Sequence, residues 1–238
     1  MISPKTTARV AGSLYLLASL LFVFATYVRS TVRGGGAAQI ADHVRASAPL
    51  FRLGVASDLV SATLFLLTAM ALYMLLQHVS RAAAGAMVVF VAVLVTVAYV
   101  NDVNELTALT IATDGAYARS LGTDASNALV ALSFQAQSNG LAISELLWGV
   151  WLVPLSYLVI RSRQFPRVVG ILLALAAVNW LAQFVADVPT PGIPLVSAVS
   201  QAGGVGELVF VGWLLVFGIR PPLPQPAGDR SSLVALPE

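Results

Sequence analysis

The residues best placed to do chemistry are acids that stand within or beside long apolar stretches. Asp58, Glu145 and Glu207 occupy similar tetrapeptides, Ser-Asp-Leu-Val, Ser-Glu-Leu-Leu and Gly-Glu-Leu-Val. Asp102 and Glu105 are three residues apart, so they share one face of a helix. Because a charge at the centre of a bilayer costs about 2.5–3.5 kcal/mol on insertion scales, acids in membrane helices face the bundle interior. These five residues are therefore the candidates for binding a proton, a cation or a small polar ligand.

The elements that carry these acids belong to a membrane protein. Of the 238 residues, 58% are hydrophobic and only 10% are charged, whereas a soluble domain has roughly 25% charged residues. This composition excludes a soluble globular domain and a disordered chain. The net charge of +2 is too small to indicate nucleic-acid binding.

The composition also limits the chemistry of any site. The chain has no Cys and two His, His43 and His78, which excludes disulfides, thiolate metal sites and histidine-rich zinc or haem ligation. The motifs of metalloproteases, serine hydrolases and Ser-x-x-Lys enzymes do not occur in the sequence. We therefore predict no catalytic residues, no bound metal and no cofactor.

The apolar stretches predict an all-α, polytopic integral membrane bundle of six transmembrane helices. About 20 apolar residues are needed to cross a bilayer, and six stretches approach or exceed that length. They cover residues 10–28, 59–76, 82–100, 140–160, 168–186 and 196–219. We assign residues 1–220 to this domain and residues 221–238 to a Pro-rich, disordered cytoplasmic tail.

The connections between these spans differ in length. His78–Arg81 forms a short turn, and Pro166 predicts a sharp start for the fifth helix. The segments 29–58 and 101–139 form long connections. Within the second of them, Thr123-Asp124-Ala125-Ser126 has the composition of a helix N-cap, so the fourth helix is expected to begin near Ser126, outside the membrane.

The distribution of basic residues predicts that both termini lie in the cytoplasm. An N-in arrangement places eight basic residues on the cytoplasmic side and five on the other, and positive charge is enriched in cytoplasmic segments. The eight are Lys5, Arg9, Arg81, Arg161, Arg163, Arg167, Arg220 and Arg230, and the five are Arg29, Arg33, Arg45, Arg52 and Arg119.

In this orientation six acids gather towards the outer side of the bilayer. Helical rise puts Glu207 about 18 Å and Glu145 about 22 Å from the inner ends of their spans. Asp58, Asp102 and Asp187 fall near the outer headgroups. This arrangement predicts an outward-facing polar pocket, with Glu207 at its floor and Glu145 on its wall.

Two alternatives to a ligand role remain open for these acids. They can bond to polar side chains on neighbouring helices, or they can pair with arginines of the first connection, namely Arg29, Arg33, Arg45 or Arg52. In either case the acids would be satisfied within the protein.

The cluster Arg161, Arg163 and Arg167 between the fourth and fifth spans is interpreted as an orientation signal and a lipid-headgroup anchor. The expected partners are the lipid bilayer and either a second copy of the chain or another membrane protein, but no nucleic acid.

Four segments together resemble a known family. They are Arg9–Leu17 (RVAGSLYLL), Leu50–Val60 (LFRLGVASDLV), Arg161–Leu173 (RSRQFPRVVGILL) and Gly206–Leu208 (GEL). In this order, over roughly residues 8–219, they are similar to the bacterial membrane proteins grouped as domain-of-unknown-function family 4386. The resemblance implies a six-helix protein of the bacterial cytoplasmic (inner) membrane, and it implies no reaction.

Three classes of function remain open. The first is a non-enzymatic membrane protein with a structural, accessory or stress-related role. The second is a small transporter or channel-like protein that uses the acidic pocket for a proton, a cation or a polar ligand. The third is an intramembrane enzyme acting on lipid or isoprenoid, in which Asp102, Glu105 and Glu145 hold a metal against a phosphate headgroup.

Overall fold

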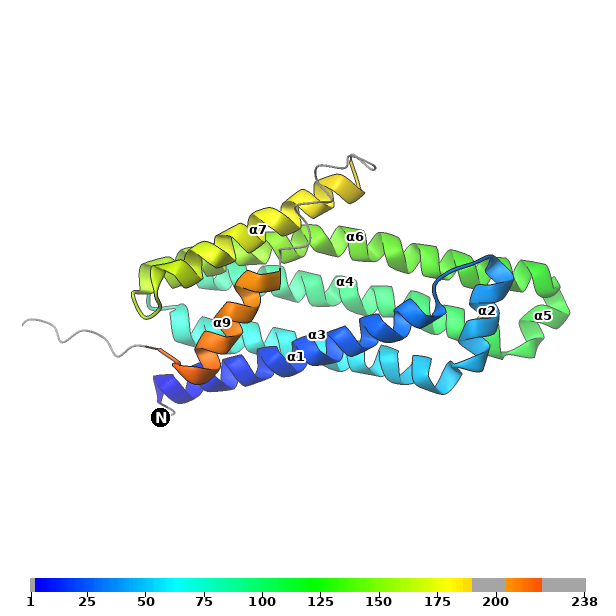
Figure 1. Ribbon diagram of the computed structural model, residues 1–238, viewed down its shortest axis with the longest axis horizontal. Helices are drawn as coiled ribbons and strands as arrows, with labels where there is room; N and C mark the ends of the chain where they lie inside the picture. The colour runs from blue at the N-terminus through cyan, green and yellow to red at the C-terminus, as the bar shows by residue number, and fades with distance from the viewer. Residues whose placement is uncertain (1–2, 190–203, 220–238) are drawn as a thin grey trace, which may run out of the picture.

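The computed structural model describes residues 3–189 and 204–219, and all regular structure within these ranges is helical. Five long helices run roughly along one axis of the molecule, and three shorter helices complete it (Figure 1). The long helices are α1 (Pro4–Val32), α3 (Ala48–Leu76), α4 (Arg81–Thr113), α6 (Thr123–Ser162) and α7 (Arg167–Asp187), and the short ones are α2 (Ala37–Ala46), α5 (Gly115–Leu121) and α9 (Gly204–Val216).

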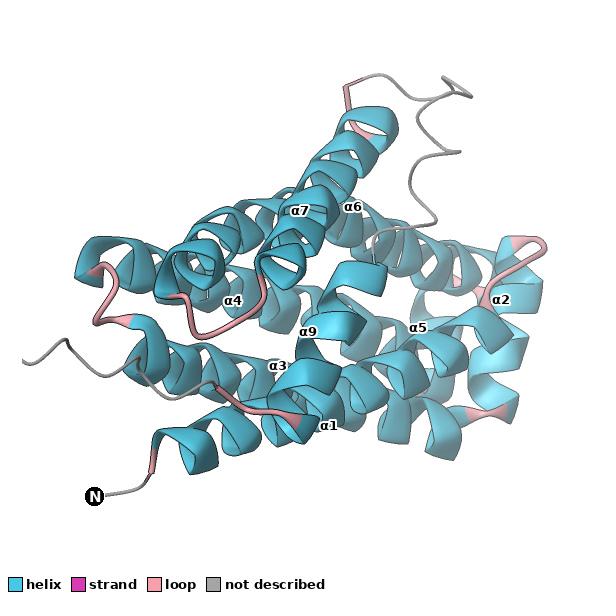
Figure 2. Cartoon of the chain, turned by 60° about the vertical axis from the view of Figure 1, so that its left-hand side comes forward, coloured by secondary structure: helices cyan, strands magenta, loops and turns pink. Residues whose placement is uncertain are grey.

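The long helices pack as neighbours in chain order and close into a bundle. Helix α1 packs along α3, α3 along α4, α4 along α6 and α6 along α7. Helix α9 then lies across the bundle and contacts both α1 and α7, which brings the last described helix against the first (Figure 2). A site at this junction is therefore built from residues of the first helix, α1, and of the last described helix, α9.

The five long helices each have the length and hydropathy needed to cross a membrane, which supports a multi-pass membrane protein. Helix α9 has 13 residues in its described part, or about 20 Å of rise, less than the roughly 30 Å of a hydrocarbon core. The first part of the predicted sixth span, residues 196–203, lies outside the described residues, as does the predicted tail 221–238. The sixth span and the N-in, C-in orientation therefore stay predictions.

All five long helices are longer than their predicted spans, and the extensions of α3, α4 and α6 take up much of the predicted long connections. The span predicted at 59–76 belongs to a helix that begins at Ala48, and those predicted at 82–100 and 140–160 belong to helices over 81–113 and 123–162. The spans were delimited by uncharged stretches. Helices α3, α4 and α6 continue past that limit because their extensions bury apolar residues against one another.

The predicted helix starts are confirmed where local chemistry sets them. Helix α7 begins at Arg167, directly after Pro166 in an extended conformation. Helix α6 begins at Thr123, within three residues of the predicted start, after Gly122 at φ 87°. The turn between α3 and α4 falls at His78–Arg81, and the Ser80 side chain caps α4 by accepting from the Ala83 amide.

The buried apolar residues form two separate cores. The larger one is formed by α1, α3, α4, α6 and α7 together with α9, and it includes Tyr15, Leu72, Trp151 and Phe210. The smaller one lies where α2 meets α3, α4 and α6, and it includes Val44, Phe51, Leu109, Val130 and Phe134. Buried charged and amide side chains of α3, α4 and α6 lie at chain positions between the two cores, namely Asp58, Asn101, Asp102, Glu105 and Gln137.

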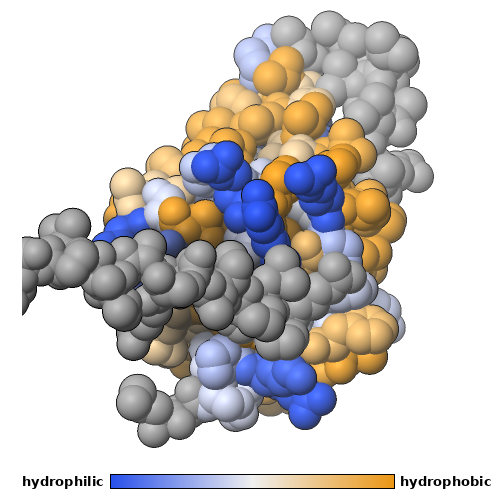
Figure 3. Space-filling view, turned by 90° about the vertical axis from the view of Figure 1, so that its left-hand side faces the viewer, coloured by the Kyte–Doolittle hydropathy of each residue, from blue (hydrophilic) through white to orange (hydrophobic). Residues whose placement is uncertain are grey.

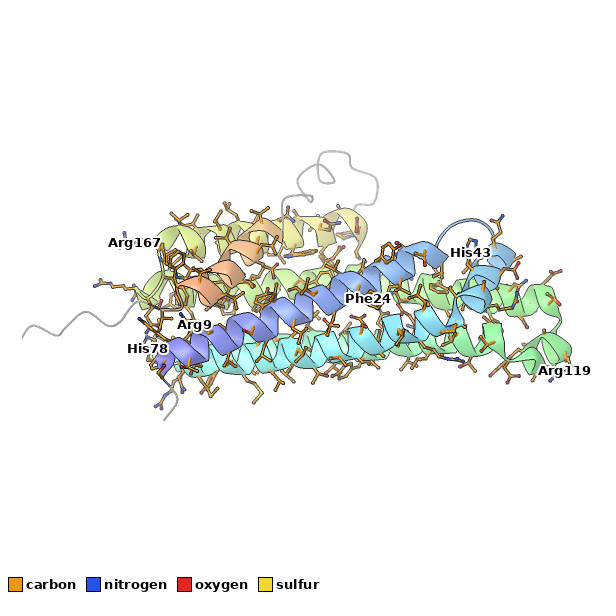
Figure 4. The ribbon with its side chains drawn as sticks, turned by 60° about the horizontal axis from the view of Figure 1, so that its bottom comes forward. Arg9, Phe24, His43, His78, Arg119 and Arg167 are labelled. Carbon is orange, nitrogen blue, oxygen red and sulfur yellow. The ribbon has the colours of Figure 1, made fainter. Side chains whose placement is uncertain are left out.

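One end of the bundle is basic. Arg9, His78 and Arg167 lie together at this end, while His43 and Arg119 lie at the opposite end (Figure 4). Viewed from this side, hydrophilic side chains gather in front of an orange, apolar flank (Figure 3).

Arg29 follows Arg9 by 20 residues along α1, about 30 Å of rise. The buried charges are therefore about one hydrocarbon thickness from the basic end.

Candidate ligand site within the helix bundle

A cavity of about 180 Å³ lies inside the bundle, between the basic end and the buried charges. Four helices line it with residues at positions i, i+3 or i+4, and i+7, which is the spacing of one helix face. On α1 the lining runs from Tyr15 to Phe22, six to thirteen residues past Arg9, and so about 9–20 Å from the basic end. The α1 part of the lining therefore lies between the basic end and Arg29. Its lining is Tyr15, Ala18, Ser19 and Phe22 of α1; Asp58, Ser61, Ala62 and Phe65 of α3; Leu94, Val95, Ala98 and Asn101 of α4; Leu141, Ser144 and Trp148 of α6; Trp180 of α7; and Glu207 of α9.

Glu207 is held in the cavity wall by two aromatic donors. The Tyr15 hydroxyl donates to its Oε2 atom, and the Trp180 indole nitrogen donates to its Oε1 atom across 2.9 Å. These donors come from α1 and α7, the two helices that α9 contacts. The carboxylate orientation is therefore fixed by the packing of three helices.

The backbone of α9 approaches α7 closely beside Glu207, which lies near the start of the described part of α9. Gly206 beside it allows a close approach, since a Cβ there would lie 2.4 Å from the carbonyl oxygen of Leu172. Small residues thus bring α9 against α7 next to the acid, as is usual at membrane helix interfaces.

Aromatic rings surround the carboxylate on both sides. On one side Phe22 packs edge-on against Trp148, and Trp148 packs against Trp180 with centroids 4.7 Å apart. On the other side Tyr15 packs edge-on against Phe65, with centroids 5.4 Å apart. Trp180 and Tyr15, the inner members of the two groups, are the residues that donate to Glu207.

Glu207 is half-buried, and unlike the buried acids Asp58, Asp102 and Glu105 it has no basic partner within the described ranges. Within the described ranges, the ion pairs are made by Arg29 and Arg45, and neither involves Glu207. Hydrogen bonds to a charged group contribute about 1.5–3 kcal/mol each, so the two donors stabilise the carboxylate without neutralising its charge.

A second polar group lies at the outer end of the cavity and is centred on Arg29. Its guanidinium group donates to Asp58 and to Glu105, and it lies 3.6 Å from Asp102. Arg29, Asp102 and Glu105 are respectively 4%, 2% and 1% exposed. Because a helical side chain points towards the N-terminus of its helix, Arg29 reaches back towards the bilayer and meets acids from α3 and α4.

Amide side chains and a second arginine extend this Arg29 cluster. Arg33 donates to the Gln137 side chain, and Asn101 donates to the Gln137 backbone carbonyl across 3.0 Å. Partial burial and the nearby Arg29 charge lower the pKa of the Arg33 guanidinium, which remains charged at any physiological pH. The cluster thus ties α1, α3, α4 and α6 together between the two apolar cores.

Glu145 belongs to a third group. Its carboxyl lies beside that of Asp187 at the end of α7, and it is half-buried. Its neighbour Ser144 lines the cavity, but Glu145 does not.

Comparison with known proteins gives one match. Residues 10–218 match the family described as domain of unknown function (DUF4386). The chain belongs to the DUF4386 family. No curated protein and no solved structure matches it.

The segments that carry the resemblance to DUF4386 converge on the cavity. Arg9–Leu17 contributes Tyr15, Leu50–Val60 contributes Asp58 and Gly206–Leu208 contributes Glu207. The fourth segment, Arg161–Leu173, contains Leu172, whose carbonyl group lies against Gly206.

The structure separates the acids that the sequence analysis grouped in this DUF4386 chain. Glu207 and Asp58 line the cavity, Asp102 and Glu105 lie in the Arg29 cluster behind Asp58, and Glu145 pairs with Asp187. The placement of Glu145 on the wall of a shared pocket is therefore not seen. Within the part of the chain that the structure describes, no three acids or histidines are arranged to hold a metal ion.

Tyr15, Trp180 and Trp148 were missed as site residues. Their sequence signal is an aromatic at membrane depth, which also describes residues that only pack, such as Trp151. Arg29 was one of four arginines considered as a partner for the acids. The structure selects it because it is the one within α1, whereas Arg52 is exposed on α3.

Arg161, Arg163 and Arg167 are exposed at the turn between α6 and α7, at the basic end of this DUF4386 protein. Arg163 adopts a left-handed conformation, with φ 55°, which ends α6 and lets the chain reverse into α7. This placement is compatible with the predicted contact to lipid headgroups.

Proposed function

We propose that the protein is a non-enzymatic, multi-pass protein of the bacterial cytoplasmic membrane that binds a small cation inside its helix bundle. The observation that carries the proposal is Glu207, a carboxylate that lines the cavity inside the bundle and has no basic partner within the described ranges. An ionisable residue within a membrane bundle marks a functional site far more often than one at a surface.

The proposal includes six spans with both termini in the cytoplasm. Its support is the basic end of the bundle, where Arg9, near the start of α1, lies at the same end as Arg167, which follows the α6–α7 turn (Figure 4). Arg161, Arg163 and Arg167 at that end carry the cytoplasmic signal and are proposed to contact lipid headgroups.

The remaining acids are given structural roles. Asp58, Asp102 and Glu105 are neutralised in part by Arg29, which is the internal satisfaction considered from the sequence. The metal-dependent enzyme is not proposed, because its three acids do not meet at one place. Asp102 and Glu105 lie against the Arg29 guanidinium, whereas the Glu145 carboxyl lies beside that of Asp187.

A small transporter for the cation is the second candidate function. In its favour, the proposed six spans would put the cavity near the middle of the membrane, and α9 contributes Glu207 to its lining. Secondary transporters bind their substrates at this depth.

The test of the binding proposal uses the full-length protein in detergent. Chloride salts of sodium, potassium, magnesium and tetramethylammonium are added at matched ionic strength, and tryptophan fluorescence is followed because Trp148 and Trp180 line the cavity. We expect a saturable change with at least one cation. It should vanish in Glu207→Gln and persist in Glu145→Gln, which removes a bundle acid outside the cavity.

Thermal unfolding supplies a second measurement that does not depend on the folding of a variant. A cation that binds the native state raises the melting temperature of the wild-type protein. The proposal is wrong if no cation changes either signal, or if Glu207→Gln is folded and responds as the wild type does.

A further inference from the structure

The geometry points to a particular class of ligand: a small alkylated ammonium ion, bound with its charge against Glu207 and its alkyl groups against the aromatic side chains of the cavity. This inference rests on the proposed cation site and adds the chemistry of the cation.

The first argument is the lining around the charge. Five aromatic side chains line the cavity, two of them hydrogen-bonded to Glu207, and the other lining residues are mostly small or apolar. Aromatic rings attract cations through their electron-rich faces, and they serve as recognition elements for quaternary ammonium groups. A carboxylate supplies the opposite charge that selects a cation over a neutral molecule of the same shape.

The second argument is that few oxygen ligands are offered to an inorganic ion. Calcium takes six to eight oxygens, and magnesium requires near-octahedral geometry. Both Glu207 oxygens already accept hydrogen bonds. The hydroxyls of Ser19, Ser61 and Ser144 are held by donating to backbone carbonyls at 2.8–3.0 Å, and the second carboxylate of the lining, Asp58, is paired with Arg29. The oxygens left for an ion are single ones on three different helices, not a preformed coordination shell. A weakly hydrated organic cation loses less on leaving water for such a lining.

The third argument is size. An apolar cavity of about 150 Å³ is enough to hold benzene, and this cavity of about 180 Å³ is slightly larger. A proton alone would need no such space. Trimethylammonium compounds with a short substituent have the size that fits, and choline is a suitable probe.

The experiment measures choline binding by calorimetry on the full-length protein in detergent, beside 3,3-dimethyl-1-butanol. This alcohol has the shape of choline with carbon in place of the charged nitrogen. We expect saturable choline binding and at least tenfold weaker binding of the alcohol.

Two variants test the aromatic contribution. Trp148→Leu should weaken choline binding about 2- to 30-fold, the range that corresponds to one cation–π contact. Trp213→Leu is the matched control and should leave the affinity unchanged, because Trp213 packs against Phe217 and does not line the cavity.

The outcomes separate this inference from the proposed function. If sodium, potassium or magnesium binds in a Glu207-dependent manner and choline does not, the cation site stands and the ammonium inference is wrong. If the alcohol binds as well as choline, the cavity does not select the charge and the ammonium inference is wrong, while the cation site is decided by the Glu207-dependent response to the inorganic cations. If no cation binds, both are wrong. Should Trp148→Leu fail to fold, the comparison of choline with the alcohol on the wild-type protein still decides.

Discussion

The Tyr15 hydroxyl of α1 donates a hydrogen bond to the Glu207 carboxylate of α9, joining residues 192 positions apart. Trp180 of α7 donates to the other carboxylate oxygen. The charge of the candidate site is therefore oriented only when α9 has packed against α1 and α7. Formation of the cavity and completion of the helix bundle are one event.

The Tyr15–Glu207 contact can be measured by Tyr15→Phe, which removes the hydroxyl group and keeps the ring in the cavity wall. A hydrogen bond to a charged group contributes about 1.5–3 kcal/mol, so we expect the free energy of unfolding in detergent to fall by about that amount. Tyr99→Phe is the control, because the Tyr99 hydroxyl forms a hydrogen bond with the exposed side chain of Thr63. Loss of this hydrogen bond should lower the free energy of unfolding much less. Equal losses in the two variants would contradict a special role for the Tyr15 hydroxyl.

Arg29 is predicted to be the most sensitive single side chain outside the cavity. Arg29→Ala leaves the carboxylates of Asp58, Asp102 and Glu105 buried without their shared cation. Breaking a buried ion pair by removing one partner costs about 3–5 kcal/mol, so we expect a large drop in melting temperature or loss of the folded protein.

Two further variants make the Arg29 prediction specific. Arg52→Ala, which removes an exposed arginine from α3, should have little effect. Arg29→Lys should restore only part of the stability, because a lysine keeps the charge but cannot donate in the two directions that Asp58 and Glu105 require. A lysine variant as stable as the wild type would show that charge alone is sufficient.

The membrane class and most helix positions could be predicted from the sequence, because they depend on local properties. The long uncharged stretches place the helices in the bilayer. Pro166 sets the start of α7, and α6 begins at Thr123, three residues before the predicted start near Ser126. The clustering of Asp102 and Glu105 followed from their spacing of three along one helix.

The grouping of the acids could not be predicted, because it depends on how helices rotate against one another. Glu145 and Ser144 are adjacent in sequence, yet Ser144 lines the cavity and Glu145 faces α7. Depth calculated from helical rise does not give this rotation. The reach of Arg29 back along α1 to acids on two other helices is likewise a tertiary property.

The contact of α9 with α7 predicts opposite effects for two glycines of α9. A Cβ at Gly206 would lie 2.4 Å from the Leu172 carbonyl oxygen, whereas one at Gly212 meets nothing within 4 Å. Gly206→Ala should therefore push α9 away, lower the melting temperature and weaken cation binding at Glu207. Gly212→Ala should be neutral or slightly stabilising, since alanine is favoured over glycine in a helix by about 1 kcal/mol. If the two variants have the same melting temperature, α9 does not pack as described.

The proposed orientation can be tested directly, because the chain contains no cysteine and single cysteines can be introduced on a clean background. Arg119→Cys and Arg163→Cys place a thiol at exposed positions at opposite ends of the bundle, the first within α5 and the second between α6 and α7. With both termini in the cytoplasm, the α6–α7 turn with Arg161, Arg163 and Arg167 stays inside, as positive charge does in cytoplasmic segments. A membrane-impermeant maleimide applied to spheroplasts should then label Arg119→Cys, and it should label Arg163→Cys only after the membrane is opened. The reverse pattern would place the basic end outside the cell and overturn the orientation while leaving the cavity and its acid where they are.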